Sequence, residues 1–125
     1  MFSISAQTSF SGSHQIILPD GSREPLHNHQ WIITAQVSSE KLNRAGLVMD
    51  FHRLRKMLDN ITAEFTDKQL EQFDYFRKNG SSAEILAEYI YYQLEKLLPS
   101  TVKLDSITVM EEPGCVACFR KLGYS

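Results

Sequence analysis

The 125-residue sequence is short of the features that define several large protein classes. It contains only two cysteines, which cannot form the disulfide framework of a small secreted domain. No apolar stretch approaches the roughly 20 residues that span a bilayer. The first ten residues, MFSISAQTSF, alternate apolar and polar side chains and lack the apolar block of a signal peptide. We therefore expect a cytoplasmic protein with no membrane partner.

The charge is equally unremarkable in amount and in distribution. Thirteen basic and fifteen acidic residues give a formal net charge of −2, with no run of like charges and no basic stripe interleaved with aromatic residues. A nucleic-acid-binding surface normally shows such a stripe, so we expect no nucleic-acid partner. With 42% hydrophobic and 22% charged residues, the composition is that of one globular domain over residues 1–125.

Both cysteines, Cys115 and Cys118, lie in one CxxC sequence near the C-terminus. A CxxC can be half of a zinc site or a redox pair. Here it stands in an apolar–polar alternation and has no second cysteine pair. We therefore predict two ordinary strand residues that behave as small buried hydrophobic side chains.

The first half of the chain has the pattern of an antiparallel hairpin. Residues Phe2–Ile17 are rich in small and β-branched side chains, and Leu18–Ser22 concentrates turn formers. A second strand is predicted from Leu26 to Ser38. Alternate residues of this strand share one face of a sheet, and its apolar face comprises Trp31, Ile33, Ala35 and Val37.

After residue 50 the apolar spacing changes to three and four residues, which indicates helices. The first begins after Asp50, a suitable N-cap, and the second begins at Ser81–Glu84 and ends at Leu98 before Pro99. Residues 62–80 are polar enough to be partly loop. Two final strands are predicted at Val102–Met110 and Val116–Arg120, which gives the element order ββααββ.

Three histidines have the spacing of a metal site. His27 and His29 lie two apart at the start of a strand, so they project from one face. The hairpin brings His14, at the end of the first strand, beside them. Three neutral imidazoles with no fourth protein ligand are typical of a catalytic zinc with an open position. The alternative is that these are surface histidines near a turn, as we expect for His52.

Five ordered blocks of the sequence are similar to the 6-pyruvoyl-tetrahydropterin synthase and 6-carboxytetrahydropterin synthase family. Two contain the histidines, and the others surround the predicted helices and the last strands. The resemblance therefore extends over nearly the whole chain. The blocks are FSGSH at Phe10–His14, LHNHQW at Leu26–Trp31, GLVMDF at Gly46–Phe51, SSAEILA at Ser81–Ala87 and VMEEPGCVACF at Val109–Phe119.

The resemblance implies an α+β structure, the T-fold, in which a four-stranded antiparallel sheet carries two helices on one face. It also implies a homo-oligomer, a trimer or hexamer, with active sites at the subunit interfaces. The zinc ligands correspond to His14, His27 and His29, and the glutamate that binds the pterin ring corresponds to Glu111. Glu84 matches a glutamate of the second-helix motif, which makes it a candidate substrate-binding residue, although it could equally be a first-turn acid favoured by the helix dipole.

The sequence departs from the family at the positions that transfer protons. Arg23 occupies the place of the family cysteine, and Thr66 and Asp67 replace an aspartate–histidine pair. Glu24 instead stands three residues before His27, and some divisions of the family carry a glutamate in this E-x-x-H arrangement. Glu24 is therefore our candidate catalytic base. Arg23 could oppose a raised pKa of Glu24 if it points inward, or bind substrate phosphates if it faces the pocket.

These features leave three hypotheses for function. The resemblance implies a zinc-dependent lyase that converts 7,8-dihydroneopterin triphosphate, with 6-carboxytetrahydropterin for queuosine and deazaguanine synthesis as the expected product. The alternative is a 6-hydroxymethyl product for folate synthesis. The loss of the cysteine would also fit a non-catalytic protein that binds zinc and pterin. A purely structural oligomer without metal is the third, and the retention of all three histidines with Glu111 argues against it.

Overall fold

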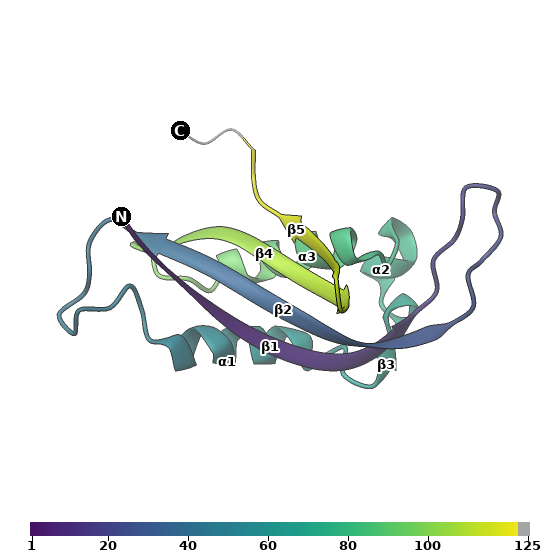
Figure 1. The fold of residues 1–125 in the computed structure, drawn as a ribbon, viewed down its shortest axis with the longest axis horizontal. Helices are drawn as coiled ribbons and strands as arrows, with labels where there is room; N and C mark the ends of the chain where they lie inside the picture. The colour runs from purple at the N-terminus through teal and green to yellow at the C-terminus, as the bar shows by residue number, and fades with distance from the viewer. Residues whose placement is uncertain (123–125) are drawn as a thin grey trace.

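A computed structural model of the chain describes residues 1–122 and shows a curved sheet with helices packed on one face (Figure 1). The sheet has the strand order β3-β1-β2-β4-β5. Helix α1 packs against β1, and α3 packs against β4 and β5. The elements in chain order are β1 (Phe2–His14), β2 (His27–Ser39), α1 (Phe51–Thr62), β3 (Lys68–Gln69), the 3₁₀ helix η1 (Leu70–Gln72), α2 (Asp74–Asn79), α3 (Ala83–Glu95), β4 (Lys103–Glu112) and β5 (Cys115–Phe119).

The predicted hairpin is confirmed. Strands β1 and β2 pair in antiparallel register along their whole length, from Phe2 opposite Ser39 to His14 opposite His27. The predicted apolar face of β2 points into the core, and its four side chains are 0% exposed. Because side chains alternate across a strand, this register fixes which residues of β1 and β2 face the helices. The fully buried set on β2 is Trp31, Ile33, Ala35 and Val37.

The cap predicted for α1 is present, and α3 has a side-chain cap within the segment predicted to begin it. The carboxylate of Asp50 accepts a hydrogen bond from the backbone N–H of His52, and the Ser82 hydroxyl accepts one from that of Ile85. These bonds satisfy donors that the first turn of a helix leaves free. Helix α3 ends at Glu95, three residues before the predicted end, although Pro99 remains beyond it.

Residues 62–80 contain more structure than we predicted. Strand β3 adds a fifth, parallel strand beside Gly12 and Ser13 of β1, followed by η1 and α2. The chain reaches this position through Asp67, which has a positive φ of 60° and donates its N–H to the carbonyl of Ser11. A left-handed aspartate is uncommon and has no clear sequence signal. The sheet is therefore mixed and five-stranded, where the sequence predicted four antiparallel strands.

The prediction of buried cysteines is wrong. Cys115 and Cys118 lie in strand β5 as expected, but both are exposed. The reason is the position of β5 at the edge of the sheet, where less of the structure covers its side chains. Among the described residues, none of the helices has the length and apolarity needed to cross a membrane.

Candidate metal centre

The buried face of the β1–β2 hairpin ends in three histidines. His27 and His29 follow the same alternation as Trp31, so all three side chains lie on the helix-facing side of β2. His14 is paired with His27 across the hairpin. The ring centroids of the three imidazoles are separated by 4.5, 4.6 and 5.1 Å, and the indole of Trp31 lies against two of them. The structure thus brings together the three predicted ligands.

Two backbone carbonyls determine which nitrogen of each ring is protonated. The Nδ1 atom of His14 lies 2.8 Å from the carbonyl oxygen of Ser81, and that of His27 lies 2.8 Å from the carbonyl oxygen of Pro25. Since a carbonyl can only accept, both Nδ1 atoms act as donors. A neutral imidazole carries one proton, so both Nε2 atoms then present a lone pair.

In the neutral rings these lone pairs converge. The Nε2 atoms of His14 and His27 are 2.9 Å apart. The Nε2 atom of His29 is buried and has no hydrogen-bond partner in the structure. Burial lowers the pKa of His29, and the charge of Glu111 opposes this effect only in part. The neutral form that binds metals is therefore favoured at His29.

A carboxylate completes the cluster. The Oε1 atom of Glu111 lies 3.7 Å from Nε2 of His14, and its Oε2 atom lies 3.5 Å from Nε2 of His29. The β4–β5 register shifts between Met110 and Glu112, which leaves Glu111 without a partner at a bulge-like irregularity. Such irregularities often redirect a side chain next to a functional site. The sequence predicts contact of Glu111 with a pterin but not its approach to the histidines.

The four side chains have the composition and spacing of a metal site. One ligand atom from each of His14, His27, His29 and Glu111 lies within 4.8 Å of the others. Unprotonated nitrogens and a carboxylate repel one another in a buried site unless a cation lies between them. Imidazole nitrogen together with carboxylate oxygen suits transition metals, zinc among them. The residues present therefore fit the metal that the resemblance implies.

The residues predicted for proton transfer and phosphate binding lie in the segment between β1 and β2. Glu24 is half-buried, and its backbone N–H donates to the carbonyl of Ile16 at 2.9 Å. Arg23 is exposed, forms a β-bridge with Ile17 and lines a cavity of about 510 Å³. Ser81, whose carbonyl binds His14, lines the same cavity, so the cavity adjoins the histidine cluster.

Two other predicted positions lie outside the cluster. Glu84 is exposed in the first turn of α3, as its alternative interpretation predicted. His52 is exposed near the start of α1, as expected for a surface residue. The sequence analysis missed the carbonyls of Pro25 and Ser81, because a backbone oxygen has no sequence signal. It also missed Glu71, which binds the backbone N–H of Gln15 directly after His14.

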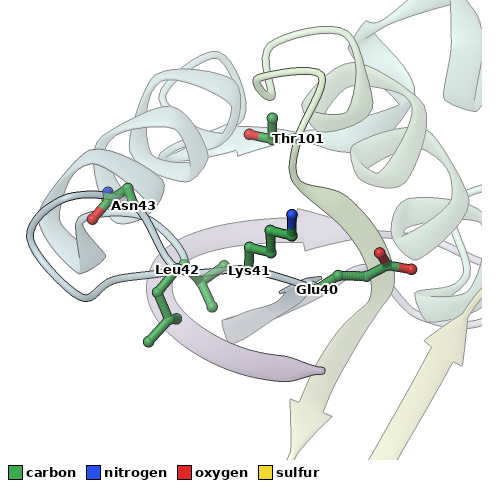
Figure 2. Close-up of a pocket in the computed structure, with 6 residues that line it drawn as sticks. Glu40, Lys41, Leu42, Asn43 and Thr101 are labelled. Carbon is green, nitrogen blue, oxygen red and sulfur yellow. The ribbon is translucent and has the colours of Figure 1, made fainter.

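A second pocket lies at the opposite end of β2. It has a volume of about 430 Å³ and is lined by residues of the loop after β2 together with Thr101. Figure 2 shows Lys41 extending toward Thr101, with the carboxylate of Glu40 to one side. None of the residues lining this pocket is a histidine or cysteine. Among the described residues, the group of side chains that could bind a metal thus lies at the histidine end of the sheet.

Comparison with known proteins gives a consistent result. A family model described as 6-pyruvoyl tetrahydropterin synthase matches residues 3–121. A dihydroneopterin monophosphate aldolase from Pyrococcus furiosus is 28% identical over 105 residues, which cover 84% of this chain and 85% of that protein. A 6-carboxy-5,6,7,8-tetrahydropterin synthase from Synechocystis is 28% identical over 115 residues, covering 89% and 87%.

Solved structures show the same fold. The 6-pyruvoyl tetrahydropterin synthase of Caenorhabditis elegans superposes with a TM-score of 0.83 and 19% identity over 96% of this chain and 95% of that one. A Plasmodium vivax 6-pyruvoyltetrahydropterin synthase, in which a glutamate described as a catalytic residue is replaced by alanine, gives a TM-score of 0.78. Its identity is 17%, and 96% of this chain and 97% of that chain are covered. The α+β fold predicted from the resemblance is confirmed.

Proposed function

This chain belongs to the 6-pyruvoyl tetrahydropterin synthase family, and from that premise we propose that it is a zinc-dependent enzyme acting on the side chain of 7,8-dihydroneopterin triphosphate. The observation that carries this proposal is the convergence of three imidazole side chains with the Glu111 carboxylate, in which the neutral rings of His14 and His27 present unprotonated Nε2 atoms. A zinc ion bound there would supply a Lewis acid for substrate oxygens.

The histidines are positioned for this role before any metal binds. The carbonyls of Ser81 and Pro25 hold two of the rings by their Nδ1 atoms and leave the Nε2 atoms free. Such outer contacts orient metal ligands and raise their basicity. The His14 ring is 0% exposed and also contacts Trp31, so it has little freedom to turn away. We propose that His14, His27 and His29 are the protein ligands of zinc.

We propose that Glu111 binds the pterin ring. An ionised carboxylate can accept two parallel hydrogen bonds, and the 2-amino group and ring N–H of a pterin present two donors side by side. The Glu111 side chain is 23% exposed, so a ligand can reach it. Its position beside the histidines puts the pterin close to the metal ligands.

Glu24 is the proposed catalytic base. It lies two residues before Leu26 in E-P-L-H, and the following Pro25 is held to His27 by a hydrogen bond. The short, anchored connection keeps the Glu24 backbone near the metal ligands. The Plasmodium vivax protein, whose catalytic residue is named as a glutamate, supports an acid of this type in the fold.

Glu24 suffices for a cleavage that needs one proton to move out and one to return. It would accept the proton of the C2′ hydroxyl as the C1′–C2′ bond breaks. The electron pair of that bond enters the conjugated dihydropterin ring, and a proton is then delivered to C1′. The products are a 6-hydroxymethyl-dihydropterin and a two-carbon aldehyde that keeps the phosphates, with no change in overall oxidation state.

The residues available for proton transfer and the name of one relative favour the 6-hydroxymethyl product. Arg23 occupies the place of the family cysteine, and Thr66 and Asp67 replace the aspartate–histidine pair, so the additional proton carriers are absent from those positions. The Pyrococcus furiosus relative is named as an aldolase. The second candidate is 6-carboxytetrahydropterin, which the Synechocystis relative favours through its name as a 6-carboxy-5,6,7,8-tetrahydropterin synthase.

We further propose that Arg23 binds the substrate phosphates. It lines the cavity next to the histidine cluster together with Arg77 and Lys78. Arg77 also forms an ion pair with Asp74 at the surface. Positive side chains at the mouth of a pocket attract and hold phosphate groups.

Assembly into a trimer or hexamer would protect the sheet edges. Strand β5 is the last strand of the sheet, and β3 covers only Gly12 and Ser13 of β1. Among the described residues, the outer edge of β1 before Ser11 pairs with no other strand, so it could pair with a strand of another copy. We therefore propose a homo-oligomer, to be tested by light scattering.

The experiment is to incubate zinc-loaded protein with 7,8-dihydroneopterin triphosphate, and separately with the monophosphate, and to identify the pterin products by mass. A 6-hydroxymethyl product supports the cleavage reaction, and a 6-carboxy product supports the second candidate. No turnover by protein shown to bind pterin would contradict both.

The base is tested by Glu24→Gln. Loss of a general base lowers the rate by roughly 10²–10⁴-fold, while zinc content should stay unchanged. Glu40→Gln is the matched control, since Glu40 is exposed at the other end of β2 and should retain the full rate. An undiminished rate for Glu24→Gln would rule out the proposed base.

A further inference from the structure

We propose that Glu111 is a fourth metal ligand in the substrate-free protein, so that the metal and the pterin compete for one carboxylate. This inference rests on the proposed function for the identity of the competing ligand. It goes beyond that function by assigning Glu111 a second role and the resting site a closed coordination shell.

The distances between the Glu111 carboxylate and the histidine nitrogens support this proposal. The Glu111 oxygens lie 3.7 and 3.5 Å from the Nε2 atoms of His14 and His29. Metal–ligand bonds of roughly 2.0–2.2 Å in a tetrahedron place the ligand atoms about 3.3–3.6 Å from one another. The 3.5 Å contact of Glu111 has the spacing of neighbouring ligands, and the 3.7 Å contact is slightly longer. The fourth member, Nε2 of His27, lies 2.9 Å from that of His14 and belongs to the same group.

In the neutral form of His14, Nε2 offers the Glu111 carboxylate no hydrogen-bond donor, because Nδ1 donates to Ser81. Nε2 of His29 is buried and has no hydrogen-bond partner in the structure. A carboxylate aimed at an imidazole lone pair is unfavourable in a partly buried site, and a shared cation makes the same arrangement favourable.

The position of Glu111 in strand β4 also supports this proposal. Glu111 lies at the register shift between Met110 and Glu112 and has no partner on β5. Its side chain is 23% exposed, whereas that of His14 is 0% exposed. Glu111 is therefore better placed than the buried His14 to leave the metal and bind an incoming ligand. The three histidines would then form the open site that a catalytic metal requires.

Cobalt(II) is a suitable probe, because its visible absorption reports the number and type of ligands. Cobalt affinity and spectrum would be measured without substrate for the wild type, Glu111→Gln and Glu112→Gln. Glu112 is the matched control, since it carries the same charge on the adjacent residue but is exposed. Circular dichroism would verify that each variant is folded.

We expect Glu111→Gln to weaken cobalt binding by at least about 10-fold, the lower range for losing even an indirect contact to a metal site, and to change the spectrum. Glu112→Gln should stay within about twofold of the wild type, because charge screening limits an exposed group. Equal affinity and an identical spectrum for Glu111→Gln and the wild type would overturn the proposal.

A second arm uses pterin without a side chain, which lacks the side-chain oxygens of the substrate. Pterin should weaken cobalt binding to the wild type, and cobalt should weaken pterin binding by the same factor, as linkage requires. Pterin that strengthens cobalt binding would overturn the competition. Neither binding measurement depends on turnover. An inactive protein that gives both expected binding results would still support this inference. An active protein that gives neither would contradict it.

Discussion

The two ends of the buried face of β2 differ in what satisfies their side chains. Toward Val37, the face is apolar and fully covered, and packing against the helices accounts for its burial. Toward His27, the same alternation carries imidazoles whose nitrogens converge, and Nε2 of His29 has no hydrogen-bond partner. One end is complete in the protein alone, whereas the other has the composition and spacing of a metal site. The proposed function thus lies where the apolar core stops.

The largest effect is expected at the apolar end. Ile33 is 0% exposed in the middle of β2, and Ile33→Ala removes buried methyl groups and leaves a cavity. We expect a loss of about 2–5 kcal/mol in the free energy of unfolding, measured by urea denaturation and equal with and without zinc. His52→Ala, on the surface, should change it by less than about 0.5 kcal/mol. If zinc restored the stability lost in Ile33→Ala, the distinction between the two ends would be wrong.

The next effect is expected at the polar end and depends on the metal. Zinc at 100 times its dissociation constant should stabilise the wild type by about 2.7 kcal/mol, because it binds only the folded state. His29→Ala should lose most of this gain, and the metal-free protein should lose only the ring contacts of His29, since its Nε2 has no hydrogen-bond partner. Thermal unfolding with zinc and with a chelator measures both values. Equal zinc stabilisation of the two proteins would contradict the assignment of His29.

A smaller effect is expected at the cavity beside the cluster. Arg23→Ala should raise KM for the phosphorylated substrate about 10-fold, or about 1.4 kcal/mol, because Arg23 lines that cavity. Unphosphorylated 7,8-dihydroneopterin should show no such change, and added salt should reduce the difference by screening an exposed charge. Steady-state kinetics with both substrates tests this. An equal rise for both would mean that Arg23 does not act on the phosphates.

The smallest effect is expected at the edge strand. Cys118→Ser should change the free energy of unfolding by less than about 0.5 kcal/mol and leave zinc content unchanged, because Cys118 is exposed and outside the metal cluster. A thiol reagent should titrate both cysteines in the folded protein. Protected thiols would show that β5 is covered in the assembled protein.

Much of the sheet and of the metal cluster could be predicted from the sequence. The alternation in β2 and the turn formers after β1 predicted the hairpin, and the hairpin register predicted the approach of His14 to His27. These are local patterns, with side-chain direction set by the period of a strand. The N-cap at Asp50 could be predicted for the same reason, since a cap depends on the few residues that follow it.

Other parts could not be predicted, because they depend on contacts distant in sequence. Strand β3 forms through Asp67, whose left-handed conformation is stabilised by a bond to Ser11. The exposure of Cys118 follows from the strand order, which places β5 at the edge. The carbonyl of Ser81 reaches His14 across 67 residues of sequence. No window of sequence contains both partners of such contacts.

The sequence by itself determined that three histidines share one strand face and one side of a hairpin, because strand period and turn position are local. Only the tertiary structure decided that Glu111, from another strand, meets them, and that backbone carbonyls hold the Nδ1 atoms of His14 and His27. The reason is physical. The chemical type of a ligand depends on the side chain at its own position, whereas the position of the imidazole protons and the contact with Glu111 depend on packing between segments distant in sequence.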